Sequence, residues 1–126
     1  MRRIVIDLDD TLTVHGVAAN YADAPPRHDV IARLRQYRAL GFEIVVHTAR
    51  NMATHEGRVG RINVATLPGI LAWLERHDVP FDEVIVGKPW CGAGGFHVDD
   101  RALRPAEFAR LSPAEAAALL DLPDAP

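Results

Sequence analysis

The feature that most constrains the fold of this chain is a short apolar run that ends in a cluster of acids. Residues 4–6 are Ile-Val-Ile, and Asp7, Asp9 and Asp10 follow directly. Such a run is typical of a buried strand in a parallel sheet. Carboxylates crowded at its end favour a bound cation, and Mg²⁺ suits them because it takes oxygen ligands. The alternative is a solvated turn after a strand, and this cluster alone does not decide between the two.

The overall composition is that of one globular domain. The chain has 126 residues, of which 48% are hydrophobic and 25% charged, so we expect a single domain over residues 1–126, with a frayed tail at about 122–126. The net charge of −3 and the lack of a basic stripe argue against nucleic acid as a partner. No apolar run suggests a membrane segment or a signal peptide, so we expect a cytoplasmic protein. The single cysteine, Cys91, excludes an internal disulfide and supports no cysteine-based zinc site.

Apolar patterns predict strands that alternate with helices along the chain. We expect strands at residues 3–8, 42–47, 84–86 and 96–98, and helices at residues 27–40, 67–77 and from 113 onward. The polar or glycine-rich stretches 13–26, 48–63 and 87–95 are expected to be loops or, in 48–63, a broken helix. This alternation predicts an α/β fold, a doubly wound, Rossmann-like parallel sheet with helices on both faces. Ligands of such sheets bind at the carboxyl ends of the strands.

Polar side chains follow every predicted strand at that edge. They are Asp7, Asp9 and Asp10 after the first strand, Thr48, Arg50 and Asn51 after the second, Lys88 after the third, and Asp99 and Asp100 after the fourth. This set suffices for metal-assisted phosphoryl transfer, because carboxylates hold Mg²⁺ while Lys and hydroxyl groups bind phosphate oxygens. One carboxylate can attack phosphorus, and a second can move the protons.

The same residues resemble the four motifs of the haloacid dehalogenase-like hydrolases. Residues 7–12, Asp-Leu-Asp-Asp-Thr-Leu, resemble the first motif, Thr48 the second, Lys88 the third and Asp99-Asp100 the fourth. The resemblance covers roughly residues 4–101 and implies a Mg²⁺-dependent phosphatase that works through an aspartyl phosphate.

The resemblance also implies a role for each motif residue. Asp7 would be the nucleophile and Asp9 the general acid and base, while Thr48 and Lys88 would bind the phosphate. Mg²⁺ would be held by Asp7, the backbone carbonyl of Asp9, Asp99 and, through water, Asp100. Substrate binding is expected from a set formed by Thr48, Ala49, Arg50, Asn51 and Lys88.

Four segments are similar to a subgroup of small phosphatases associated with capsular polysaccharide biosynthesis in bacteria. They are residues 48–52, 60–64, 87–92 and 96–101. This likeness implies a small phosphorylated substrate such as a sugar phosphate. The connections between motifs are too short for a separate cap domain. We therefore expect a homo-oligomer whose neighbouring subunit helps to cover the site.

Three other functions remain open from the sequence. A phosphotransferase of the same family would pass the phosphoryl group to an alcohol instead of water. A receiver-like signalling module uses similar residues, but its acceptor Asp lies in mid-chain, unlike Asp7. A phosphate-binding protein without catalysis is disfavoured because Asp7 and Asp9 are both present. The sequence assigns no role to a further set, which comprises His15, His55, Trp90 and Cys91.

Overall fold

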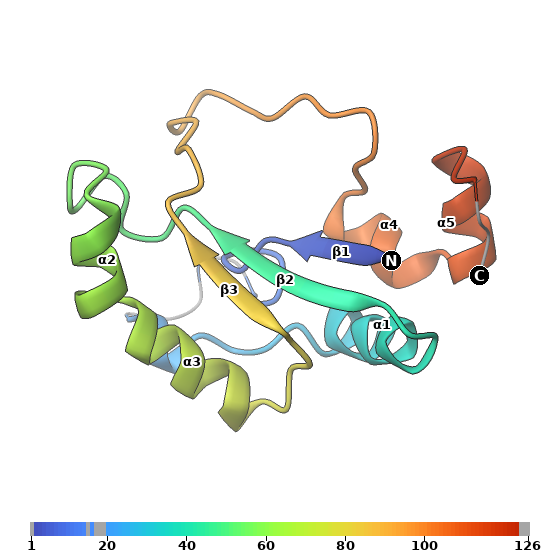
Figure 1. Cartoon of the computed structure of the whole chain (residues 1–126), viewed down its shortest axis with the longest axis horizontal. Helices are drawn as coiled ribbons and strands as arrows, with labels where there is room; N and C mark the ends of the chain where they lie inside the picture. Colours follow the sequence, from blue (N-terminus) through green and yellow to red (C-terminus); the bar gives the residue numbers. More distant parts are fainter. Residues whose placement is uncertain (1, 15, 17–19, 124–126) are drawn as a thin grey trace.

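A computed structural model describes residues 2–14, 16 and 20–123 of the chain. Its strands are β1 (Arg3–Ile6), β2 (Glu43–Thr48) and β3 (Glu83–Val86). Its helices are the short 3₁₀ helix η1 (Tyr21–Asp23), α1 (His28–Ala39), α2 (Val59–Ala65), α3 (Leu67–Arg76), α4 (Pro105–Arg110) and α5 (Pro113–Leu119). The predicted α/β class with a parallel sheet is confirmed (Figure 1).

The three strands form one parallel sheet in the order β1-β2-β3. Ile6 of β1 pairs with Val46, and Val86 of β3 pairs with Thr48. Parallel pairing requires a crossover between successive strands, and α1 provides the first one while α2 and α3 provide the second. All three strands therefore end at the same edge of the sheet.

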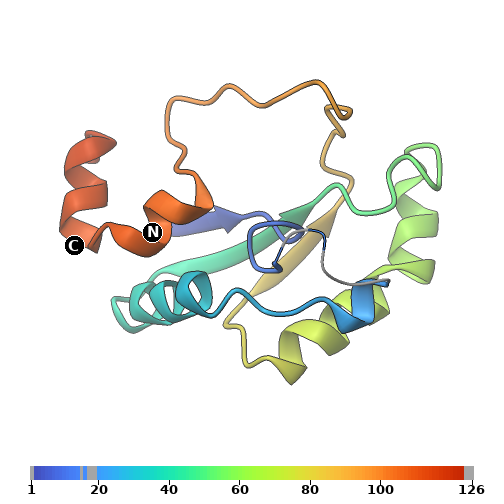
Figure 2. The same cartoon turned by 180° about the vertical axis from the view of Figure 1, so that it is seen from behind.

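The hydrophobic core lies between one face of the sheet and helices α1 and α3 (Figure 2). Alternate strand residues such as Ile6, Ile44 and Val46 point into it, as the period of two in a strand requires. The helices contribute residues at helical spacing, among them Leu34 from α1 and Trp73 from α3. The indole Nε1–H of Trp73 donates to the carbonyl of Ala24 at 2.9 Å, which ties the segment before α1 to this core.

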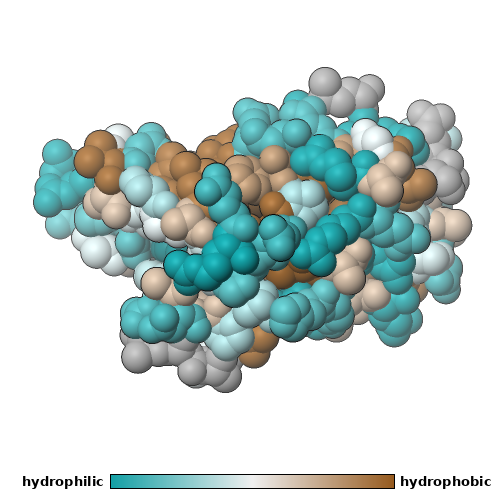
Figure 3. Space-filling model, turned by 90° about the horizontal axis from the view of Figure 1, so that it is seen from below, coloured by the Kyte–Doolittle hydropathy of each residue, from teal (hydrophilic) through white to brown (hydrophobic). Residues whose placement is uncertain are grey.

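The opposite face of the sheet differs from the prediction of helices on both faces. In the part of the chain that the structure describes, no helix is drawn over this face, which is turned to the viewer in Figure 1. Val5 is 60% exposed and Ile85 46% exposed. From below, hydrophobic residues gather mainly along the upper left margin of a mostly hydrophilic surface, on the side that faces the viewer in Figure 1 (Figure 3). This face stays without a helix because α4 packs against α1 on the opposite, covered side, where Phe108 stacks on Tyr37.

The predicted fourth strand at residues 96–98 was wrong. These residues lie in an irregular connection between β3 and α4, and Phe96 and Val98 are 80% and 88% exposed. Three apolar residues form a stable strand only when a neighbouring strand pairs with them, and here none does. Gly95 helps to shape this connection, because a Cβ atom there would collide with the carbonyl of Cys91.

Other predicted boundaries need smaller corrections. β1 ends at Ile6 rather than Leu8, because residues after Ile6 turn sharply, with the carbonyl of Leu8 accepting from the backbone N–H of Leu12. Part of the stretch predicted as a loop or broken helix forms α2, and α4 was not predicted. The helix at the C-terminus was predicted correctly from its capping box, since Ser112 accepts from the backbone of Glu115 and the Glu115 side chain accepts in return. Residues 124–126 of the expected frayed tail lie outside the described residues.

None of the helices in the described ranges has the length and apolar character needed to cross a membrane. The predicted loop at residues 13–26 is closed at its base, where the backbone of Val14 donates to Pro25 and that of Arg27 donates to Leu12. This base lies beside the carboxyl end of β1. His15, within the loop, lies outside the described residues.

Asp82, directly before β3, connects α1 and β2 at the end of the sheet opposite to the carboxyl ends of the strands. Its carboxylate accepts hydrogen bonds from the backbone N–H of Ile44 and from the Arg38 guanidinium, both at 2.8 Å. The Ile44 N–H first, and then Arg38, hold the pKa of Asp82 below its ordinary value of 3.8. A lowered pKa means stability that is present above pH 3.8 and lost as the pH falls through the lowered value.

We therefore expect Asp82→Ala to lower the melting temperature at pH 7. The difference from the unmodified protein should shrink as the pH falls below 3.8. Thermal unfolding followed by circular dichroism from pH 7 to pH 2 measures both effects. Glu83→Ala, at an exposed neighbouring position, is the control and should change little. An equal loss in both variants would contradict the role assigned to Asp82.

Candidate active site

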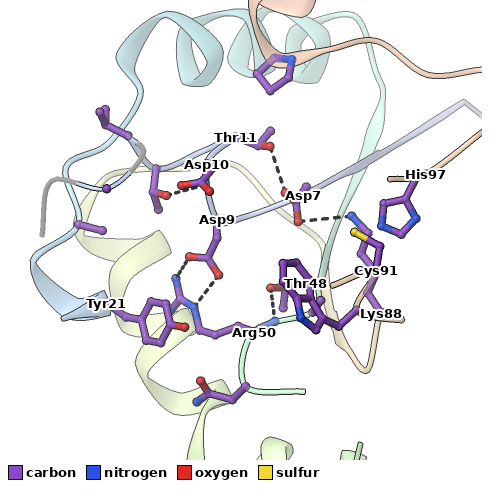
Figure 4. A pocket seen from close by; sticks show the side chains of 18 of the residues that line it. Asp7, Asp9, Asp10, Thr11, Tyr21, Thr48, Arg50, Lys88, Cys91 and His97 are labelled. Atoms are coloured by element: carbon purple, nitrogen blue, oxygen red, sulfur yellow. Dashed lines mark hydrogen bonds and ion pairs between the residues drawn. The ribbon is translucent and has the colours of Figure 1, made fainter. Parts of the chain in front are cut away.

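The carboxyl ends of the three strands open into one pocket of about 1250 Å³. Asp7 follows β1, Thr48 ends β2 and Lys88 follows β3, and all three line this pocket (Figure 4). The parallel register explains the convergence, because it brings residues distant in sequence to the same level of the sheet. The predicted meeting of the first three strand ends is therefore confirmed.

Asp7 lies at the centre of this group. One carboxylate oxygen lies 3.4 Å from the Lys88 ammonium, and the other accepts a hydrogen bond from the Thr11 hydroxyl at 3.1 Å (Figure 4). The backbone N–H of Lys88 donates to the carbonyl of Thr48 at 3.2 Å, which fixes where the lysine leaves the sheet. Both charged side chains stay partly open to solvent, Asp7 at 35% and Lys88 at 23%. A ligand can therefore reach the carboxylate and the ammonium together.

Thr48 contributes a buried hydroxyl to the floor of the pocket. Its side chain is almost fully enclosed, and its oxygen accepts from the backbone N–H of Arg50 at 3.1 Å. A hydroxyl that accepts one hydrogen bond still has its own hydrogen to donate. Thr48 can therefore donate to an anion bound above Asp7.

Arg50 is a buried cation whose partner is Asp9. Its Nη2 and Nε atoms donate to the two carboxylate oxygens of Asp9 at 2.7 and 3.1 Å. The guanidinium also lies over the ring of Tyr21, 4.1 Å from its centre (Figure 4). The expected substrate contact of Arg50 is thus replaced, in this arrangement, by a two-point contact that holds Asp9.

The residues beside Arg50 in the predicted substrate-binding set have structural partners too. Asn51 adopts a left-handed backbone conformation with a φ of 62°. Its amide donates to the Thr66 hydroxyl at 2.8 Å, which connects the loop to the start of α3. Ala49 and Asn51 both line the pocket.

Asp10 lines the pocket, and its backbone stabilises the turn after β1. Its φ of 62° places it in the left-handed region, and its backbone N–H donates to the Thr13 hydroxyl at 2.9 Å. The turn sends the chain back so that Asp9 and Thr11 face the site. Thr11 and Tyr21 were not predicted as site residues. Only the position of Thr11 two residues after Asp9 in the first motif could have indicated it.

Asp99 and Asp100 do not join the other predicted metal ligands. Both are exposed in the connection between β3 and α4, and neither lines the pocket. The pKa of Asp99 is held below its ordinary value, first by the backbone N–H of Arg101 and then by Asp100. Their position follows from the missing fourth strand, which would have carried them to the sheet edge.

The described residues of one chain therefore do not fit the predicted Mg²⁺ site. They hold no group of three or more His, Cys, Asp or Glu side chains that could bind a metal ion. Asp7 and Asp9 are each already neutralised by a cationic side chain, and Asp10, the third acid that lines the pocket, belongs to the turn after β1.

The connection that carries Asp99 also forms a wall of the pocket through other residues. Trp90, Cys91, Phe96 and His97 line it, and His97 lies near Lys88 and Cys91 in Figure 4. His47 precedes Thr48 in β2 and does not line this pocket; burial lowers the pKa of His47, and the Lys88 charge adds to this effect. His47 is therefore neutral at pH 7. His55 lies in a separate small pocket with Arg58 and Arg61.

Comparisons with known proteins give one informative relative. No protein-family model and no curated protein matches the chain. A crystal structure of a protein from Vibrio cholerae matches it with a TM-score of 0.93 and 54% sequence identity. The match covers 96% of this chain and 98% of that one, and the description of that structure names no activity.

The Asp9–Arg50 pair can be tested by a double-mutant cycle. We expect Arg50→Lys, Asp9→Asn and the combined variant to give a coupling free energy of about 1.5–3 kcal/mol, because the pair is charge-assisted and two-pronged. Lysine keeps the charge but loses the paired geometry. Urea unfolding of the four proteins measures the coupling.

The exposed pair Arg3–Glu43, with an N–O distance of 3.3 Å, is the matched control. Its coupling should stay below about 1 kcal/mol, because water screens it. Equal couplings for the two pairs would show that Arg50 does not hold Asp9 in the way described.

Proposed function

The chain belongs to the same family as the Vibrio cholerae protein, and from its own site we propose that it is a phosphomonoester hydrolase. The observation that supports this most strongly is the Asp7 carboxylate held between Lys88 and Thr11 above the buried Thr48. A carboxylate can attack phosphorus, and Lys and Thr groups can neutralise and orient the phosphate oxygens. The resemblance to haloacid dehalogenase-like hydrolases points to the same chemistry.

In the first half of the reaction, a carboxylate oxygen of Asp7 attacks the phosphorus atom. The P–O bond to the substrate alcohol breaks, and Asp9 gives its proton to the leaving oxygen. Asp7 is left as an aspartyl phosphate. Lys88 and Thr48 stabilise the charge on the phosphoryl oxygens, which supplies the electrostatic part of catalysis.

In the second half, Asp9 takes a proton from water, and the resulting hydroxide attacks the phosphorus. The bond between phosphorus and Asp7 breaks, phosphate leaves, and Asp9 is protonated again. The two hydrogen bonds from Arg50 fix the orientation of the Asp9 carboxylate beside Asp7. Arg50 is thus a positioning residue for this step.

We include Mg²⁺ in the proposal for two reasons. The ion can stabilise negative charge on a phosphate monoester, and the acidic motif offers the oxygen ligands that it prefers. Its ligands must include groups beyond the acids that meet in the pocket of one chain. When bound, the ion would neutralise phosphoryl charge.

The substrate we propose is a small phosphorylated metabolite, such as a sugar phosphate in polysaccharide biosynthesis. The pocket is open and lined by apolar as well as polar residues, including Trp90 and Phe96, which gives room for a group beyond the phosphate. The same openness would admit an alcohol as acceptor, so a phosphotransferase is the second candidate. A cytoplasmic location and the absence of a nucleic-acid partner remain predictions.

We expect the protein to hydrolyse p-nitrophenyl phosphate with Mg²⁺, to lose activity with a chelator and to regain it when Mg²⁺ is restored. Asp7→Asn should lower kcat by at least about 10³-fold, because the amide is a poor nucleophile. The matched control is Glu83→Gln, at the opposite end of the sheet. Intact-mass analysis should detect a phosphorylated enzyme that Asp7→Asn cannot form. Full activity in Asp7→Asn would rule out this nucleophile, and an inactive unmodified protein would rule out the function.

Added alcohols such as glycerol distinguish hydrolysis from transfer, since only a transferase forms a new phosphate ester.

Asp9 can be tested by changing the leaving group. Nitrophenolate departs without a proton, whereas an alkoxide from a sugar phosphate needs one. Asp9→Asn should therefore still release a first burst of nitrophenolate and then stall, because water lacks its base. With an alkyl phosphate, the same variant should show no burst, and rapid-quench kinetics measures both. Equal loss of the burst with the two substrates would contradict the proton-donor role.

A further inference from the structure

Among the residues that the structure describes, no strand lies beside the outer edge of residues 4–6 in β1. β2 is the central strand, and β1 pairs with it on one side only, with no other described strand on its outer side. β1 is apolar in its middle, and its Val5 side chain is 60% exposed. An apolar edge strand is a template for pairing with another strand.

The same chain carries an extended segment that lacks backbone partners. Within the connection at residues 89–103, residues 96–103 form no backbone-to-backbone hydrogen bond with any described residue. Figures 1 and 2 both show this connection arching away from the sheet. At its centre Phe96 and Val98 are 80% and 88% exposed, and their spacing of two residues puts them on one side of an extended chain. Backbone groups and large apolar side chains in this state favour association with a complementary surface.

The ends of this segment are fixed to their own chain. At one end, the Lys88 N–H bonds to Thr48. At the other, the Phe108 ring of α4 stacks on Tyr37 with a centre distance of 5.4 Å, and Arg33 donates to the carbonyl of Ala109 at 3.1 Å. Between these anchors the segment arches away from its own β1, and Phe96 and Val98 remain largely exposed, although Phe96 also borders the pocket. A free edge and a free segment on one molecule make it self-complementary, which is what a two-fold dimer requires.

We propose that the protein forms a symmetric dimer in which residues 96–98 of each copy lie as a fourth, parallel strand along the free β1 edge of the other. With Phe96 beside Ile4 and Val98 beside Ile6, the partner's Asp99 falls next to Asp7. Parallel direction agrees with the rest of the sheet. The same pairing places the partner's Asp99 and Asp100 at the carboxyl end of β1. In the single chain these two acids lie away from the pocket.

The dimer itself does not depend on the proposed function. Only its chemical consequence, a shared Mg²⁺ site, rests on that function. Asp7 and the partner's Asp99 and Asp100 would give Mg²⁺ the carboxylate oxygens that one chain does not assemble. Each of the two sites in the dimer would then be shared between chains. The pairing of strands itself can be tested without any activity.

The first experiment traps the contact between two different chains. One variant carries Val5→Cys and a purification tag, the other carries His97→Cys without a tag, and both carry Cys91→Ser. In the proposed register residues 5 and 97 are neighbours, within the Cα distance that a disulfide spans. After mixing, unfolding, refolding and mild oxidation, we expect a tagged–untagged disulfide dimer. A Val64→Cys variant in place of Val5→Cys is the control, since Val64 is 80% exposed on α2, and should give no such product.

The second experiment measures mass in solution by light scattering. The unmodified protein should have twice the 13.8 kDa mass of one chain. Phe96→Asp combined with Val98→Asp should give monomers that keep their circular dichroism spectrum, whereas Val64→Asp should stay dimeric. A monomeric unmodified protein, or no heterologous disulfide, would overturn the dimer. A variant that carries Val5→Cys and His97→Cys on one chain gives a further test. If it forms the disulfide only within single chains, the dimer is also overturned.

Complementation tests whether the site is shared. Asp7→Asn and Asp99→Asn should each be inactive, but chains refolded together should recover roughly one quarter of the activity, because half of the dimers are mixed and each has one intact site. No recovery, with active unmodified enzyme, would overturn the shared site. If the unmodified protein is itself inactive on phosphate esters, the proposed function fails, while the cross-link and the mass still decide the dimer.

Discussion

Parallel pairing of the central strand with both of its neighbours is the constraint on which the rest of this molecule depends. It forces every strand to end at one edge, so residues that are separated by forty or more positions in the sequence meet within a few ångströms. The 3.4 Å contact between Asp7 and Lys88 and the backbone bond from Lys88 to Thr48 are direct results. The core on the side of α1 and α3 keeps the strands in this register, because a slip by one residue would turn Ile44 and Val46 out of it.

The charges at this edge are balanced in pairs. Lys88 faces Asp7, and the buried Arg50 grips Asp9 while its other side rests on Tyr21. A buried guanidinium is costly unless a carboxylate pairs with it, so the loop after β2 and the turn after β1 stabilise each other. The same arrangement leaves Asp7 more open than Arg50. Because Asp7 stays partly exposed, a ligand can reach it while Arg50 holds Asp9 in place beside it.

The sequence predicted those parts of the structure that depend on local patterns. Strands one to three, α1, α3 and the capped α5 follow from periodicity and from cap residues such as Ser112, and the convergence of Asp7, Thr48 and Lys88 follows from strand order. The failures lie where a distant partner decides. Residues 96–98 have the composition of a strand, but composition cannot say whether a neighbour is present to pair with them. The Asp9–Arg50 contact was missed for a similar reason, since a loop arginine beside a predicted phosphate site gives no sign of whether it faces the substrate or a neighbouring acid.

The exposed strand edge and the distant acids of the fourth motif have a common physical explanation. A three-stranded parallel sheet with one bare face and an apolar edge buries less surface than such sheets normally need, because parallel sheets are covered on both sides. A candidate strand for the open edge and the missing carboxylates lie on the same stretch of chain, between β3 and α4. One association step would therefore correct both deficits, since placing residues 96–98 on an edge strand necessarily carries Asp99 and Asp100 to its end. In the proposed dimer the sheet and the metal site would be completed in the same step, which would couple activity to assembly, whereas a lone chain keeps Asp7 paired with Lys88 and holds Asp99 and Asp100 away from the pocket.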